Sequence, residues 1–245
     1  MRVLALDTTT RDGSVGIVDD GRVLALRSGP SSRSHAERLP GDLMDVLADA
    51  GMTPRDIDLF SVASGPGSFT GVRIGLAAIQ GMAMVTGKKV VAVSALDALA
   101  MAAAERLTAP ARVAAWMDAL RQEVFSAVYD ICPPMDWTNV DVAALDAPQV
   151  DRPLAIVEQW QRNGCAPALV IGDGAVRYAA LLADVASVEP PPPLAPFLAR
   201  LAAARVEYAT PPSGIEPLYV RRTDVELARD RAAAQTSRRD DSPAS

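Results

Sequence analysis

The sequence predicts an α/β protein made of two similar halves, each with a mixed sheet flanked by helices. Two observations lead to this prediction. Short apolar strands alternate with helical patterns along the chain, which is typical of sheets covered by helices. Each half also opens with a hairpin that carries an aspartate at its turn, Asp7 in the first half and Asp118 in the second. This repetition suggests a duplicated architecture.

Composition narrows the class of protein. The chain has 245 residues, 49% of them hydrophobic, and a formal net charge of −6. This hydrophobic content is enough for a large folded core, and the acidic balance disfavours tight, direct binding to nucleic acid. The two cysteines, Cys132 and Cys165, form no CxxC pair. With no signal peptide or membrane-spanning run expected, the chain is predicted to be cytoplasmic.

His35 is the single histidine of the chain. A zinc site of the His/Cys kind needs more ligands than this sequence offers. A Ser–His–Asp triad would have this one base to use, and a metalloprotease is almost excluded.

The first half begins with a predicted antiparallel meander. Its three strands are expected at residues 2–7, 14–18 and 22–26. Ser34 and Glu37 form a capping-box pattern at the start of a helix that ends at Gly51, although Pro40 could mark the true start. Further elements follow in order: a strand at 59–63, a helix at 71–86, a strand at 89–93 and a helix at 95–104.

A break at 107–110 separates the halves. We expect strands at 112–117, 123–129 and 168–171, with helices at 154–162, 175–185 and 194–206. The last helix follows the four-proline linker 190–193 and is long enough to cross back onto the first half. The predicted division is a first lobe at 1–106 completed by 194–225, a second lobe at 107–193, and a disordered tail at 226–245.

The stretch 64–76 joins a strand to a helix through a glycine-rich loop and has three interpretations. A phosphate-binding P-loop is disfavoured because Gly71 is followed by Val-Arg rather than Lys and Ser or Thr. A dinucleotide site is disfavoured by the glycine spacing. The third interpretation is a helix kept thin by Gly71 and Gly75 so that another helix can approach, with Met82 and Met84 as core filling.

Several motifs occur together in one order. They are Leu4-Ala-Leu-Asp-Thr-Thr9, Ser34-His-Ala-Glu37, Ser64-Gly-Pro-Gly-Ser-Phe-Thr-Gly-Val-Arg-Ile-Gly75, Met117-Asp-Ala-Leu-Arg-Gln-Glu-Val124, Gly172-Asp-Gly-Ala175 and Pro217-Leu-Tyr-Val-Arg221. Over residues 1–225 this set resembles the TsaB (YeaZ) family of bacterial tRNA threonylcarbamoyladenosine biosynthesis subunits. The resemblance implies an actin-like ATPase fold (ASKHA, ribonuclease H-like) of two similar lobes.

The resemblance also implies a role and partners. The chain would be a non-catalytic subunit that binds and activates its paralogue TsaD, with TsaE as an accessory ATPase. That assembly modifies adenosine 37 in tRNAs that read ANN codons. Alone, the chain would form a homodimer. The alternative is an independent actin-like ATPase or small-molecule kinase.

Two sets of site residues follow from the resemblance. A weak, vestigial nucleotide site, with ATP or ADP at the interface with partners, would use Asp7, Thr8, Thr9, Asp118, Gly172 and Gly174. The structural alternative is that Asp7, Thr8 and Thr9 only cap a turn. The interface would use His35, Leu39, Leu43, Phe69, Val72, Arg73, Gly75, Leu76 and Ile79.

No metal is expected, because TsaD-like relatives hold metal with histidines four residues apart on this helix. Here Leu39 stands at the second position. The pairs Arg221–Arg222 and Arg238–Arg239 could touch tRNA, but arginine pairs in an acidic chain are usually solvated. Contact with tRNA is therefore expected to be indirect.

Overall fold

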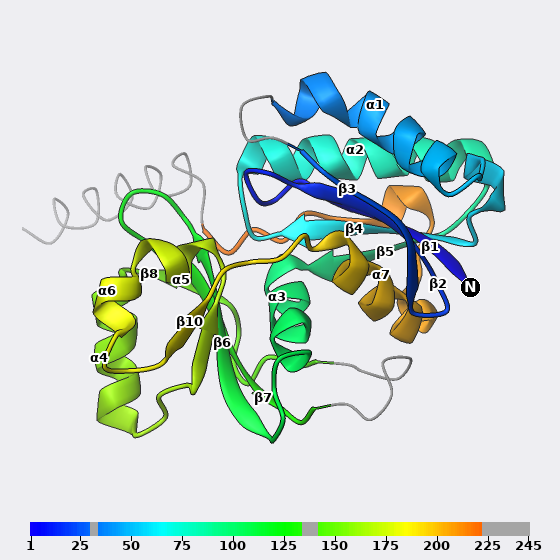
Figure 1. The fold of residues 1–245 in the computed structure, drawn as a ribbon. Coiled ribbons are helices and arrows are strands. Elements are labelled where there is room, and N and C mark those ends of the chain that lie inside the picture. Colours follow the sequence, from blue (N-terminus) through cyan, green and yellow to red (C-terminus); the bar gives the residue numbers. More distant parts are fainter. Residues whose placement is uncertain (30–33, 134–141, 222–245) are drawn as a thin grey trace, which may run out of the picture.

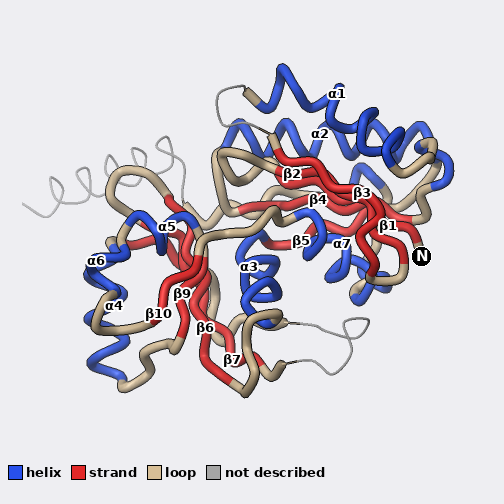
Figure 2. The backbone as a smooth tube through the Cα atoms, in the orientation of Figure 1, coloured by secondary structure: helices blue, strands red, loops and turns tan. Residues whose placement is uncertain are grey.

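A computed structural model describes residues 1–29, 34–133 and 142–221. These residues form two five-stranded mixed sheets, each flanked by helices, arranged as two bodies side by side (Figures 1 and 2). The predicted fold class is confirmed. The predicted tail 226–245, together with Arg222, Arg238 and Arg239, lies outside the described residues.

The first sheet has the strand order β3-β2-β1-β4-β5. Its strands are β1 (Arg2–Asp7), β2 (Ser14–Asp19), β3 (Arg22–Ser28), β4 (Leu59–Gly65) and β5 (Val90–Ser94). The first three form the predicted antiparallel meander, and β4 and β5 run parallel to β1. The turn between β2 and β3 is tight because Asp20 and Gly21 both adopt positive φ.

Helices cover both faces of this sheet (Figure 1). The helices α1 (His35–Asp49) and α2 (Phe69–Thr86) lie on one face, where Leu4 and Leu6 of β1 point. The helices α3 (Ala95–Ala104) and α7 (Ala195–Ala204) lie on the other face with Val3 and Ala5. The period-2 alternation of β1 therefore assigns its side chains to two separate cores.

One predicted helix start is confirmed and another is shifted. The helix α1 begins at His35 with the predicted capping box, so Pro40 lies inside it rather than at its start. The helix α2 begins at Phe69, two residues earlier than predicted, because the Ser68 hydroxyl accepts a hydrogen bond from the Gly71 amide and caps it.

The second sheet has the strand order β10-β9-β6-β7-β8. Its strands are β6 (Ala111–Asp118), β7 (Val124–Ile131), β8 (Gln149–Asp151), β9 (Leu169–Ile171) and β10 (Ser187–Glu189). It packs against α4 (Pro153–Asn163), α5 (Asp173–Arg177) and α6 (Ala179–Leu182). The single helix predicted at 175–185 is wrong. The residues expected to form the preceding loop already belong to α5. Tyr178, whose φ is −111°, then separates α5 from α6.

The two bodies share one hydrophobic core. The helix α3 packs against β4 and β5 of the first sheet and also against β6 and β7 of the second. Residues of both sheets, such as Val91 and Ala115, therefore belong to the same buried cluster. The helix α7 returns to the first sheet, where it contacts β1 and β2.

The C-terminal part of the described chain runs along both bodies. Short 3-10 helices at Pro54–Asp56, Val206–Tyr208 and Pro212–Gly214 complete the described elements. Thr210 pairs with Val90 of β5 through two 3.0 Å backbone hydrogen bonds. The amide of Leu218 donates to the carbonyl of Ser64 at 2.8 Å. Farther on, Arg221 donates to the Ala119 carbonyl and pairs with Glu123.

Candidate functional site

Residues 8–13 join β1 to β2, and we call them the first turn. The Asp7 carboxylate that precedes it is buried and accepts three hydrogen bonds: from the Thr9 amide (2.8 Å), the Thr9 hydroxyl (2.6 Å) and the Thr10 hydroxyl (2.7 Å). Thr8 and Thr9 are buried as well. In this arrangement Asp7 organises its own turn, as an Asx-type cap does.

Thr8 lies against two glycines of α2. Its hydroxyl donates to the Gly71 carbonyl at 2.8 Å. A Cβ built on Gly71 would collide with the Thr8 carbonyl oxygen, and one built on Gly75 would collide with the Thr8 hydroxyl. The interpretation that these glycines leave a face free for another helix is therefore corrected, since the close approach they allow is that of the first turn.

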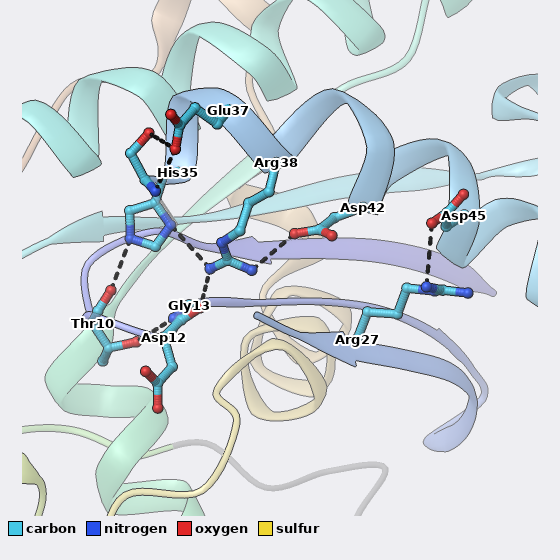
Figure 3. A network of polar contacts seen from close by, with 10 residues as sticks. Thr10, Asp12, Gly13, Arg27, His35, Glu37, Arg38, Asp42 and Asp45 are labelled. Carbon is cyan, nitrogen blue, oxygen red and sulfur yellow. Dashed lines mark hydrogen bonds and ion pairs between the residues drawn. The ribbon is translucent and has the colours of Figure 1, made fainter. Parts of the chain in front are cut away.

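The side chains of α1 contact the first turn from the other side (Figure 3). His35 Nε2 lies 2.9 Å from the Thr10 carbonyl oxygen, and His35 Nδ1 lies 3.1 Å from Arg38 Nη2. The buried Arg38 guanidinium also donates to the Asp12 carbonyl and pairs with Asp42 at 2.9 Å. Because Arg38 can donate but not accept, Nδ1 of His35 is the acceptor and Nε2 carries the proton toward Thr10.

This assignment bears on metal binding. Both ring nitrogens of His35 have partners within the chain, and Leu39 at the next helical position is buried in the core. Within residues 1–29, 34–133 and 142–221, no group of three or more His, Cys, Asp or Glu side chains is arranged to hold a metal ion.

In the second half, the turn that follows β6 is held in a similar way by Asp118. Its carboxylate accepts from the Leu120 amide at 3.1 Å and pairs with Arg177 at 2.6 Å. The Asp173 carboxylate accepts from the amides of Asp118 (3.0 Å) and Gly174 (2.9 Å). Burial raises the pKa of the Asp173 carboxyl above its usual value.

Gly172 and Gly174 pack directly on the backbone of β6. Gly172 has φ +131°, and a Cβ there would collide with the Trp116 carbonyl. A Cβ on Gly174 would lie 3.0 Å from the Met117 carbonyl carbon. These glycines serve the contact between α5 and β6.

The six predicted nucleotide residues thus form two clusters, one in each half. Asp7, Thr8 and Thr9 make one, and Asp118, Gly172 and Gly174 make the other. In both clusters the carboxylate accepts hydrogen bonds from groups of this chain. A cavity of about 400 Å³ lies elsewhere, beside β5, lined by Val91, Ala92, Tyr208 and Ile215 among others.

The predicted interface residues fall into three groups. Six of the nine are buried in the core between the first sheet and its helices: Leu39, Leu43, Val72, Gly75, Leu76 and Ile79. His35 holds the first turn. Phe69 and Arg73 are exposed, but they contact the chain's own Tyr219. The rings of Phe69 and Tyr219 stack with centroids 5.3 Å apart, and Arg73 Nε donates to the Tyr219 hydroxyl at 3.0 Å.

The structure instead exposes an apolar surface on the outer side of α1 and α2, which we call the outer face. Its largest side chains are Met44 (59% exposed), Met84 (69%) and Val85 (88%). Its small residues are Pro40, Gly41, Ala48, Ala77 and Gly81. The prediction that Met84 fills the core is therefore wrong, whereas Met82 does pack partly against the core.

Helix α2 has an unusual composition for a surface helix. By length and composition alone it could cross a membrane, and one third of its residues are buried. Its buried side covers the first sheet, so the apolar remainder lies on the outer face. Helical phase was the signal that could have found this surface, because its residues lie one or two positions away from those facing the sheet.

Comparison with known proteins gives the family. The model of the TsaD family, tRNA N6-adenosine threonylcarbamoyltransferase, matches residues 30–146. A protein of Mycobacterium tuberculosis without an assigned function is 37% identical over 91% of this chain and 93% of its own length. The tRNA threonylcarbamoyladenosine biosynthesis protein TsaB of Escherichia coli is 34% identical over 67% of this chain and 71% of its own length. The chain belongs to the TsaB family.

A solved structure agrees with this assignment. A Pseudomonas aeruginosa protein described as similar to the peptidase YeaZ superposes with a TM-score of 0.74. It is 30% identical, and the match covers 90% of this TsaB-family chain and 99% of that protein. The match to the TsaD model includes α1 and α2, so the outer face lies in the part that TsaB-family and TsaD-family proteins share.

Proposed function

We propose that this chain is a subunit of tRNA threonylcarbamoyladenosine synthesis that binds its paralogue TsaD through the outer face and catalyses no step itself. The assembly, in the cytoplasm and with TsaE as accessory ATPase, modifies adenosine 37 of tRNAs that read ANN codons. Alone, the chain pairs with a second copy through the same face. Contact with tRNA is made by the partner.

The outer face is the observation that carries this proposal. Soluble proteins rarely leave Met44, Met84 and Val85 so exposed on adjacent helices without a partner that covers them. Gly41 and Gly81 support the same conclusion. A Cβ on either would have no atom of the chain within 4 Å, so neither glycine is required by packing within the chain. Glycine at such positions lets a partner helix come close, at a cost of about 1 kcal/mol each in helix stability.

The paralogue is a suitable partner for a geometric reason. TsaD shares the matched region 30–146, which contains both helices of the outer face. Two related chains can pair these helices about an approximate two-fold axis, as identical chains do in an isologous dimer. The same geometry accounts for a homodimer when the paralogue is absent.

The lack of catalysis is supported by the two clusters. Asp7 and Asp118, the carboxylates that an actin-like ATPase would use, are both taken up by donors of this chain. This geometry disfavours the alternative of an independent ATPase or small-molecule kinase. ATP turnover by the purified chain that is lost on Asp7→Ala would support that alternative over our proposal.

The interface is tested by Ala77→Arg, which places a long cation in the middle of the outer face. We expect association with TsaD, measured by titration calorimetry, to weaken at least about tenfold, because an unpaired charge would be buried. The matched control is Ala180→Arg, the same change at an exposed position of α6.

Both variants should keep the circular dichroism spectrum of the parent. The control should bind TsaD as the parent does, and tRNA modification in the reconstituted assembly should fall with Ala77→Arg alone. Unchanged binding by a folded Ala77→Arg variant would overturn the assignment of this face.

A further inference from the structure

We propose that the first turn sets the position of α1 relative to α2, and that Thr8 and His35 are therefore positioning residues for partner binding. The inference rests on the proposed function, since it concerns the two helices of the outer face. Neither residue belongs to that face: Thr8 is buried, and His35 points into the turn (Figure 3).

Thr8 and Thr9 join the turn to α2. The Thr8 hydroxyl donates to the Gly71 carbonyl in the first turn of that helix, and Gly75 one turn later has no room for a side chain beside the same hydroxyl. Thr9 fits against Gly67 just before the helix, where a Cβ would lie 2.7 Å from the Thr9 Cβ. The helix can neither slide nor rotate here without breaking these contacts.

His35 and Arg38 join the turn to α1. They reach the carbonyls of Thr10 and Asp12 from the N-terminal end of that helix. Gly13 completes the fit: it has φ +59°, and a Cβ there would lie 2.7 Å from His35 Cε1. The first turn therefore packs between the N-terminal ends of α1 and α2.

The turn is itself firmly held. The Asp7 carboxylate binds Thr9 and Thr10, and the Thr10 hydroxyl in turn accepts from the Gly13 amide at 3.2 Å. These bonds are buried or partly buried, where each is worth more than in water. The side-chain oxygens of Asp7, Thr8, Thr9 and Thr10 are thus all bonded within this chain.

Partner binding should depend on this arrangement. A partner that covers Met44 of α1 and Met84 of α2 together must match the separation of the two helices. If that separation varies, binding must restrict it, and affinity is lost without the loss of any direct contact.

The test compares Thr8→Val, which removes the hydroxyl and keeps the shape, with Thr8→Ser, which keeps the hydroxyl. The matched control is Thr86→Val, which removes a similar hydroxyl-to-carbonyl bond at the far end of α2. Affinity for TsaD is measured below the melting temperature of every variant. We expect Thr8→Val to bind about tenfold more weakly, since one hydrogen bond contributes about that much to a free energy. The other two variants should bind as the parent does.

A second measurement does not need the partner. Spin labels on cysteines that replace Met44 and Met84, with Cys132 and Cys165 substituted, report the distance between the helices within one chain when the labelled chain is diluted into an excess of unlabelled chain. Thr8→Val should broaden that distance distribution, whereas Thr86→Val should not. Should Thr8→Val fail to fold, His35→Ala tests the same point from α1.

The outcomes are distinct. A wild-type chain that does not bind TsaD refutes the proposed function, while the label distances still decide the role of the turn. Parental distances in Thr8→Val overturn the inference, whatever its affinity, and parental affinity with broadened distances overturns the link to partner binding.

Discussion

Tyr129 of β7 donates a 2.9 Å hydrogen bond to Asp97 of α3 and so joins the second sheet to a helix of the first half. The same carboxylate pairs with Arg205 at 2.8 Å, just after α7. Three separate segments therefore meet at one polar group inside the shared core.

Replacing Tyr129 by Phe removes this bond without creating a cavity. Tyr129 is fully buried, and its partner is charged, so we expect the free energy of unfolding to fall by about 1–3 kcal/mol. Urea unfolding followed by fluorescence measures it. Tyr208→Phe, at an exposed tyrosine, is the control and should change little. Equal stability of both variants would show that the Tyr129–Asp97 bond contributes nothing.

The same pair predicts an alkaline loss of stability. Burial and the neighbouring Asp97 raise the pKa of Tyr129 well above its ordinary value near 10. Below pH 10 the phenol is protonated in both the folded and unfolded states, so its contribution is fully present. Above pH 10 the unfolded chain releases the proton and the folded chain does not, so stability falls by up to about 1.4 kcal/mol per pH unit.

This contribution is isolated by comparing the parent with Tyr129→Phe at pH 9, 10 and 11. The stability advantage of the parent should shrink above pH 10, because the variant has no phenol to ionise at this site. An advantage that stays constant over this range would contradict the prediction.

Gly75 and Gly81 of α2 should respond oppositely to alanine. Gly75→Ala forces a methyl group against Thr8, and we expect it to lower the free energy of unfolding by about 1–3 kcal/mol. Gly81→Ala meets open space within the single chain and should raise the stability of the monomer, measured at dilution, by up to about 1 kcal/mol. Thermal unfolding of the two variants decides this, and a loss of stability for both would show that Gly81 is also packed within the chain.

The turn between β6 and β7 should gain from glycine. Leu120, Arg121 and Gln122 all have left-handed backbones, with φ of 59°, 52° and 63°. Such a backbone costs a residue other than glycine about 1–2 kcal/mol. After the entropy of glycine in the unfolded chain is subtracted, Leu120→Gly should raise stability by about 0.5–1 kcal/mol. Leu120→Ala is the control, since it removes the same exposed side chain but keeps the backbone strain.

Local patterns determined the order of most elements. The apolar run of β1, the alternation of β7, the capping box at Ser34 and the C-cap at Gly87 each follow from residues close in sequence. The strand β10 was not predicted, because a strand of three residues carries too little periodicity. The interruption at Tyr178 likewise has no local breaker such as proline or glycine.

The sequence by itself determined the fold class, the two hairpins with their aspartates, and the motifs that indicate the family. Only the tertiary structure decided what those groups face. Gly75 and Gly81 look alike in the sequence, yet Thr8 occupies the space beside the first and nothing occupies the space beside the second. The sequence shows Asp7 at the end of a strand, and only the structure shows the three donors within the chain that its carboxylate binds. A helix shows its period in sequence, but which side is covered depends on residues far along the chain.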